Sequence, residues 1–147
     1  MATMIPNRVV IDTNVCLDLF VFRDERYQPL LGALREGRLQ AVTNATCRKE
    51  WIFILDYPHL PLDETGKAAV VAEFDALINK VDDSKRDDII LPVCKDKEDQ
   101  KFLELARDSH ASLLLTKDKA LLKLAKRNAR MGLFAILSPD QWLVLMQ

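Results

Sequence analysis

The sequence has few residues of the kinds that build redox centres, zinc sites or disulfide frameworks. It contains three cysteines and two histidines, and no two cysteines have the spacing of a CxxC pair. Cys16, Cys47 and Cys94 have apolar neighbours, so we expect reduced thiols that are mostly buried. His59 and His110 stand alone, without metal-ligand spacing, and are interpreted as structural or surface residues. The composition therefore favours neither a disulfide-linked fold nor a zinc site.

Long hydrophobic runs and a strong net charge are also absent. No apolar run approaches the roughly 18 residues that a membrane-spanning helix needs. The opening MATMIPNRVV has no long apolar stretch after a basic one, so we expect no signal peptide and a cytoplasmic location. The formal net charge is -1. The whole chain therefore has no strong attraction to nucleic acid or anionic membrane, and any nucleic-acid binding must come from a local patch.

The length and the apolar content suit one domain with a substantial core. The chain has 147 residues, of which 49% are apolar and 29% charged. It contains no internal repeat and no low-complexity segment. The stretch 82–88 (DDSKRDD) is interpreted as a surface loop, because too little chain remains on either side for it to separate domains. We therefore expect a single domain over residues 1–147.

Short apolar runs alternate with helical patterns along the chain. The runs are rich in Val, Ile and Leu rather than strictly alternating, which is typical of strands covered on both faces. The expected strands are residues 8–12, 40–43, 89–92, 112–116 and 133–137. The expected helices are residues 26–36, 45–57, 64–80, 98–108 and 118–130, and a last one that follows Ser138 as N-cap and has Pro139 at its first position. Strands alternating with helices predict an α/β fold with a parallel sheet and right-handed crossovers.

Acidic residues follow the expected strands at equivalent places. Asp12 ends the first strand, and Glu50 lies in the helix after the second. Asp96 and Asp99 stand at the start of the helix after the third strand, and Asp118 follows the fourth. The carboxyl ends of parallel strands meet at one edge of a sheet. We therefore expect these acids to share one pocket.

Each acid also has a simpler interpretation. Asp118 could be a helix N-cap, and Asp99 could favour the positive end of its helix. Asp12 could be a turn residue, because Asp and Asn hydrogen-bond their own backbone and stop strands. Glu50 is the hardest to interpret as a cap, because it lies inside a helix beside the apolar run WIFIL. We expect that run, including Trp51, to face the core rather than a partner.

A pocket of carboxylates needs compensating positive charge, because crowded carboxylates raise each other's pKa values. Basic side chains or a divalent cation could supply it. Hard oxygen ligands without His or Cys favour Mg²⁺ or Mn²⁺ over zinc. Such ions act on phosphates, since they neutralise the substrate and lower the pKa of water.

The segments VVIDTNV, DKEDQKFLELA and LLLTKDKALL, together with a Glu in the second helix region, resemble a PIN domain in their order and spacing. The nearest similarity is to VapC-like toxin components of bacterial type II toxin–antitoxin pairs. The resemblance covers almost the whole chain. It implies a three-layer α/β/α sandwich with a central parallel sheet of about five strands. It also implies Mg²⁺- or Mn²⁺-dependent cleavage of RNA phosphodiesters, usually leaving a 5′-phosphate.

The resemblance assigns roles to particular residues. It implies a catalytic, metal-binding cluster of Asp12, Glu50, Asp99 and Asp118, supported by the small polar residues Asn14 and Thr116 and by Asp96 as an extra acid. In this hypothesis three aspartates hold one or two ions, directly or through water, and Glu50 helps to orient the attacking water. Many members of the family dimerise, and many are inhibited by a cognate antitoxin. Others serve in RNA processing, and a PIN fold that binds RNA or protein without cutting remains an alternative.

A basic segment follows the last of these acids. Residues 117–130 hold six basic residues and one acid. One interpretation is a solvated amphipathic helix with Leu121, Leu124 and Ala125 pointing inward. The other is a phosphate-contacting rim, which would make binding strongly salt-dependent. The expected RNA-binding residues are Arg48, Lys49, Lys117, Lys119 and Lys123.

Other enzyme and signalling classes fit the pattern less well. A phosphatase of the haloacid dehalogenase type needs a second Asp two residues after the first, where this chain has Asn14. A receiver-like domain needs an acid pair before the first helix and a Lys after the last strand, and neither is present. For the expected homodimer, Leu60, Leu62 and the apolar end WLVLMQ are candidate contact surfaces.

Overall fold

The computed structural model describes residues 3–82 and 87–146. Five parallel strands form one sheet in the order β3-β2-β1-β4-β5. The strands are β1 (Ile5–Ile11), β2 (Gln40–Thr43), β3 (Ile78–Lys80), β4 (Ala111–Leu115) and β5 (Ala135–Leu137). The strand order reverses direction between β1 and β4, and ligands of open α/β sheets bind at such a switch point. The residue that follows β1 therefore lies at the centre of the carboxyl edge.

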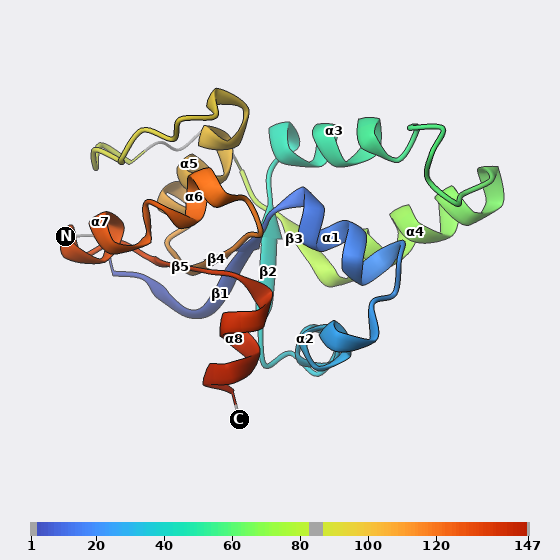
Figure 1. Ribbon diagram of the computed structural model, residues 1–147, viewed down its shortest axis with the longest axis horizontal. Coiled ribbons are helices and arrows are strands. Elements are labelled where there is room, and N and C mark those ends of the chain that lie inside the picture. Colours follow the sequence, from blue (N-terminus) through green and yellow to red (C-terminus); the bar gives the residue numbers. More distant parts are fainter. Residues whose placement is uncertain (1–2, 83–86, 147) are drawn as a thin grey trace.

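Helices cover both faces of this sheet (Figure 1). They are α1 (Thr13–Phe20), α2 (Gln28–Arg35), α3 (Ala45–Ile54), α4 (Glu64–Leu77), α5 (Gln100–Asp108), α6 (Lys119–Leu122), α7 (Ala125–Arg130) and α8 (Pro139–Leu145), with short 3-10 helices η1 (Glu25–Tyr27) and η2 (Lys97–Asp99). Because successive side chains of β1 point to opposite faces, Val9 packs in one buried apolar cluster and Val10 in another. The predicted three-layer α/β/α sandwich with a parallel sheet of about five strands is confirmed.

The third expected strand, residues 89–92, is wrong. This segment is irregular, with Ile90 81% exposed beside the buried Leu91. Pro92 lacks the N–H that a central strand would donate, which counts against pairing there. The sheet instead gains β3 from the end of the expected helix 64–80, because the chain turns from helix to extended backbone at Ile78. Ile78 also fits the helical spacing of apolar residues, and neither Gly nor Pro marks the change.

Most of the expected helices are present and differ from expectation at their ends, with two exceptions. The helix α1 is not among the expected helices, because Asp12 and Asn14 are interpreted as turn or site residues and not as the start of a helix. The expected helix 118–130 consists of two helices, α6 and α7. The N-cap at Ser138 is confirmed, and it forms a capping box with Gln141. Of the expected loop 82–88, residues 83–86 lie outside the described residues.

The expectations for buried apolar residues are confirmed in part. The three cysteines are free and buried. Trp51 is 1% exposed and stacks on Phe74 with ring centroids 5.1 Å apart, so it belongs to the core. Leu60 is buried and therefore wrong as a contact surface, whereas Val144 at the C-terminal end is exposed. A helix with the length and apolar character needed to cross a membrane is absent from the described residues.

Candidate functional site

Asp12 lies at the centre of the carboxyl edge, between the end of β1 and the start of α1. It caps α1 and is only 3% exposed. The Thr116 hydroxyl donates a hydrogen bond to its Oδ2 at 2.6 Å, and the backbone N–H of Asn14 donates to Oδ1 at 3.4 Å. Burial raises the pKa of Asp12, the two hydrogen bonds oppose that shift, and the charges of Asp118 and Glu50 add to it.

Thr116 joins the ends of two adjacent strands. It follows β4 and is fully buried. Besides donating to Asp12, its hydroxyl accepts a hydrogen bond from the backbone N–H of Asp118 at 3.0 Å. Asp118 in turn caps α6, because its Oδ1 accepts from the backbone N–H groups of Ala120 at 2.7 Å and Leu121 at 3.2 Å. One hydroxyl thereby sets the positions of two acids from different strands.

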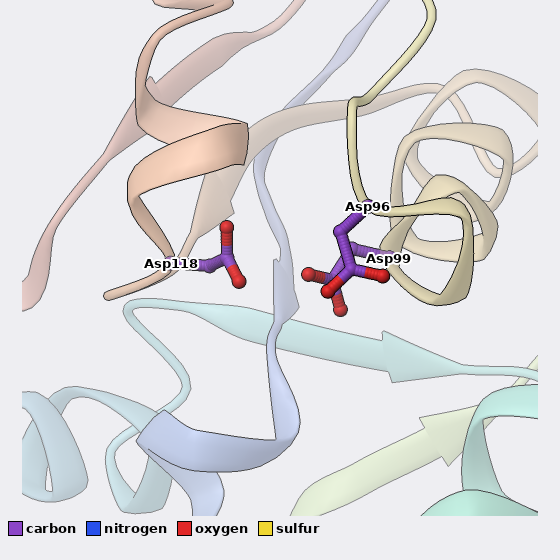
Figure 2. Close-up of side chains that lie close together, drawn as sticks. All are labelled: Asp96, Asp99 and Asp118. Atoms are coloured by element: carbon purple, nitrogen blue, oxygen red, sulfur yellow. The ribbon is translucent and has the colours of Figure 1, made fainter.

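Asp96, Asp99 and Asp118 form a group of three carboxylates whose oxygen atoms lie within 4.8 Å of one another. Figure 2 shows Asp118 on one side and Asp96 with Asp99 on the other, with their carboxylates turned toward each other. The pKa of Asp99 is raised to about 8, first by burial, then by a hydrogen bond with Asp118 and by the charges of Asp12, Asp118 and Asp96. Burial accounts for the largest part of the shift, and the three neighbouring aspartates add to it because their negative charges are close.

The place of these acids in the chain differs from the expected one. Asp99 was predicted to follow the third strand, but the irregular segment before α5 carries it to the sheet edge. Asp96 also caps the 3-10 helix η2, since it accepts from the backbone N–H of Glu98 at 3.0 Å. The acids therefore lie at one edge of the sheet, although no strand directly precedes the segment that carries Asp96 and Asp99.

Glu50 lies beside this group but is bound by other side chains. The Thr13 hydroxyl donates to its Oε1 at 2.7 Å, and the ammonium of Lys101 forms an ion pair with its Oε2. Burial lowers the pKa of Lys101, but the hydrogen bond and the charge of Glu50 outweigh that effect and raise it overall. Sequence reasoning missed Lys101 and Thr13, because only the packing of α3, α1 and α5 brings them to Glu50.

The other sequence-predicted residues are distributed around the edge. Asn14 is exposed, and its backbone N–H rather than its side chain bonds Asp12. Lys117 donates to Asp18 at 2.6 Å, and Arg48 pairs with Asp75 at 2.7 Å. The remaining predicted RNA-binding residues, Lys49, Lys119 and Lys123, are exposed.

The chemistry of the donor set fits a hard divalent cation. The three grouped residues offer only carboxylate oxygens, the ligands that Mg²⁺ and Mn²⁺ prefer. Cys94 lies near enough to feel their charge, and its pKa is raised by burial and by Asp99, Asp118 and Asp96. Burial likewise raises the pKa of Cys47 to about 12. Both thiols therefore stay protonated at neutral pH, which disfavours a thiolate metal site here.

Comparison with known families agrees with this geometry. The family model described as PIN domain matches residues 8–120, a range that contains Asp12, Glu50, Asp99 and Asp118. None of the curated proteins compared with the chain matches it. PIN domains are generally nucleases that act on RNA and typically use divalent metal ions. Since the match spans most of the sequence and the sheet has the expected architecture, the chain belongs to the PIN domain family.

Proposed function

We propose that this protein is a Mg²⁺- or Mn²⁺-dependent endoribonuclease whose active site is the acidic edge of the sheet. One observation supports the proposal most strongly. The carboxylate oxygens of Asp96, Asp99 and Asp118 lie within 4.8 Å of one another at the strand-order reversal of a PIN domain. Carboxylates crowded in this way repel unless a cation joins them. That arrangement is suited to binding an ion that phosphate groups can share.

Each residue of the site has a proposed role that follows from its position. Asp12, Asp99 and Asp118 would hold the ion, directly or through water, with Asp96 as a further ligand and Glu50 completing the cluster. When bound, the ion neutralises charge on the phosphate and lowers the pKa of water. Thr116 fixes the orientation of Asp12, and Thr13 and Lys101 fix that of Glu50. In this proposal Glu50, held by these two residues, would help to orient the attacking water.

The reaction is hydrolysis of an RNA phosphodiester. The oxygen of water bonds to phosphorus, and the bond from phosphorus to the 3′ oxygen breaks. The 3′ oxygen takes a proton, so the products are a 5′-phosphate and a 3′-hydroxyl. In this proposal water attacks phosphorus directly, so the cleavage passes through no covalent enzyme intermediate.

The basic residues near the site are proposed to hold the RNA backbone. Lys119 and Lys123 lie on or next to α6, the helix that begins after Asp118, and are exposed. Lys49 is exposed beside Glu50. Lys117 and Arg48 already pair with acids, so we assign them a smaller share of phosphate contact. Binding should weaken steeply with salt.

A finer proposal concerns the biological role. We propose that residues 1–147 act as one domain, in the cytoplasm, as the toxin of a type II toxin–antitoxin pair. It would work as a homodimer inhibited by an antitoxin. The support is the VapC-like order of the sequence motifs. Induced expression should arrest bacterial growth, and co-expression of a small neighbouring gene should relieve it. Growth without arrest, alongside RNA cleavage in vitro, would favour an RNA-processing nuclease.

The enzymatic proposal is tested by cleavage of a labelled RNA with Mn²⁺. We expect Asp99→Asn and Asp12→Asn to lose at least 100-fold in rate, because one removes a ligand from the group and the other its central neighbour. The control is Glu104→Gln, which removes an exposed acid from α5 and should cleave at the wild-type rate. Equal rates in all four proteins would contradict the assignment. Tight RNA binding without any cleavage by the wild type would favour a non-catalytic PIN module.

A further inference from the structure

Exposed aromatic rings lie on the last turn of α3, the helix that carries Glu50, and on the segment that follows it. Phe53 is 64% exposed and Tyr57, just beyond the helix, is 42% exposed. Their rings meet edge to face with centroids 5.8 Å apart, and the ring of Tyr57 lies 5.8 Å from that of His59. The rings form one connected aromatic surface. A connected exposed aromatic surface is a candidate for a site of interaction.

Phe53 borders an open surface hollow of about 400 Å³. The hollow is lined by Ala45, Arg48, Lys49, Ile52, Phe53, Asp56 and Lys80. Arg48 pairs with Asp75, and Asp56 pairs with Lys67. Within residues 3–82 and 87–146, by contrast, Lys49 and Lys80 make no ion pair. The charge that this hollow leaves uncompensated is therefore positive.

This surface is continuous with the proposed active site. The helix α3 starts at the carboxyl edge of β2, and Figure 1 shows it extending from that edge to the right of the view. Glu50 turns inward and bonds Thr13. Lys49 and Phe53 are one helical turn apart and border the same hollow, so they share one face of the helix, and Phe53, three residues after Glu50, is its neighbour on the helix surface. An RNA strand bound across the acidic group can continue along this face of α3.

We propose that the α3 face, formed by Lys49, Phe53, Tyr57 and Lys80, binds single-stranded RNA next to the cleaved bond. A base stacks on Phe53, and the two lysines contact phosphates. The inference rests on the proposed ribonuclease function and names the form of its substrate. Stacking requires an unpaired base, because the faces of paired bases are hidden inside a duplex. Rings interleaved with basic side chains are the usual surface for single-stranded nucleic acid.

The composition of this face favours RNA over a protein partner. Lysine is depleted at the centre of protein interfaces, where aromatic and apolar residues dominate. Here lysines border the hollow on which the exposed ring lies, and further ion pairs surround it. A protein would have to bury those charges, whereas a polyphosphate chain pairs with them.

The test measures binding in EDTA, so that no cleavage occurs, with a short fluorescent single-stranded RNA. We expect Phe53→Ala to weaken binding by roughly 5- to 150-fold, which is the usual contribution of one base stacked on an aromatic ring, and Phe53→Tyr to restore it. Lys49→Ala with Lys80→Ala should reduce the slope of log affinity against log salt by about 1.4. The control is Val144→Ala on α8, which is similarly exposed at 66% and should bind like wild type.

A second readout reports stacking itself. In a Phe53→Trp variant, single-stranded RNA should quench the fluorescence of the new indole, and in Val144→Trp it should not. Wild-type affinity in Phe53→Ala, or equal affinity for a duplex of the same sequence, would overturn the inference. So would a change of sedimentation in Phe53→Ala without a change in RNA affinity, since the face would then be a protein interface.

The two proposals fail separately in this design. RNA binding through Phe53 without Mn²⁺-dependent cleavage by the wild type would refute the ribonuclease and support the α3 path. Cleavage that depends on Asp99, together with unchanged RNA binding in Phe53→Ala, would support the ribonuclease and refute RNA binding along α3.

Discussion

The Thr116 hydroxyl and the Asp12 carboxylate, 104 residues apart in the chain, are joined by a buried hydrogen bond of 2.6 Å. This contact fixes the end of β4 to the end of β1 at the point where the strand order reverses. The same hydroxyl accepts from the backbone of Asp118. The relative position of two acids from separate strands therefore depends on one oxygen atom.

Replacing that oxygen should weaken both the fold and the site. Thr116→Val leaves a buried carboxylate without its donor and the Asp118 N–H without its acceptor, so we expect a loss of about 1–3 kcal/mol in the free energy of unfolding. Urea denaturation measures it. Thr43→Val is the matched control, since Thr43 is also buried at a strand end but makes only a 3.4 Å bond to its neighbour's carbonyl. A similar loss in both variants would mean that the hydrogen bond to Asp12 adds nothing to the free energy of unfolding beyond the burial of a threonine.

The raised pKa of Asp99 predicts how stability depends on pH without metal. The value is about 8 in the fold against an ordinary 3.8, so the folded state holds a proton that the unfolded state releases. Stability should therefore fall as pH rises from about 4 to about 8. In Asp99→Asn this loss should be absent. Melting temperatures in EDTA at pH 5 and pH 8.5 measure the effect, and the variant should gain on wild type at the higher pH. A constant difference between the two proteins would show that Asp99 is not crowded.

A divalent cation should reverse that loss. Mn²⁺ at 100 times its dissociation constant should stabilise the protein by about 2.7 kcal/mol, because it binds the folded cluster and not the unfolded chain. The affinity should decrease as pH falls below about 8, since Asp99 must lose its proton to bind. Thermal melts with and without Mn²⁺ check this. The shift should vanish in Asp99→Asn and persist in Glu104→Gln, and a shift of equal size in all three proteins would contradict a site at these acids.

Lys101 should act oppositely on stability and on cation binding. Lys101→Met removes the ion-pair partner of Glu50, whose side chain is 26% exposed, so we expect a loss of about 1 kcal/mol in metal-free protein. The same change makes the edge more negative and should strengthen Mn²⁺ binding severalfold. Calorimetric titration at low salt measures the affinity. Lys123→Met, which removes an exposed lysine next to α6, serves as the comparison. Weaker Mn²⁺ binding in Lys101→Met would mean that Lys101 mainly holds Glu50 in place for the ion.

The sequence predicts the sheet well because its strands are short apolar runs with polar ends. The expected range 40–43 is that of β2 to the residue, and the expected range 112–116 is shifted by one residue from β4, whereas β1 begins three residues before the expected range 8–12. It fails at β3, where Ile78 satisfies both a helical and an extended pattern. It also misplaces the approach of Asp99, because Ile90 and Leu91 have strand composition but only one of them is buried. The strand preference of a short segment does not show whether that segment will pair with a neighbouring strand.

The candidate site likewise has residues that the sequence predicts and residues that it does not. The acids can be found in the sequence because each lies in or near a connection that follows an apolar run. Lys101 does not stand out, since its partner Glu50 is 51 residues away and belongs to a different helix. The pairing arises only once α3 and α5 pack together. The ion pairs that compensate charge inside a pocket are therefore the part of a site that is hardest to predict from the sequence.

The double use of Asp118 has a consequence for how quickly the centre can exchange its occupant. Its Oδ1 is held at the first turn of α6 by hydrogen bonds from two backbone N–H groups. Asp12 is likewise immobilised by Thr116. The entropy of arranging these two carboxylates was lost when the chain folded, so little rearrangement remains for capture or release. We expect entry and departure of the cation to be limited by shedding its water shell rather than by motion of the protein.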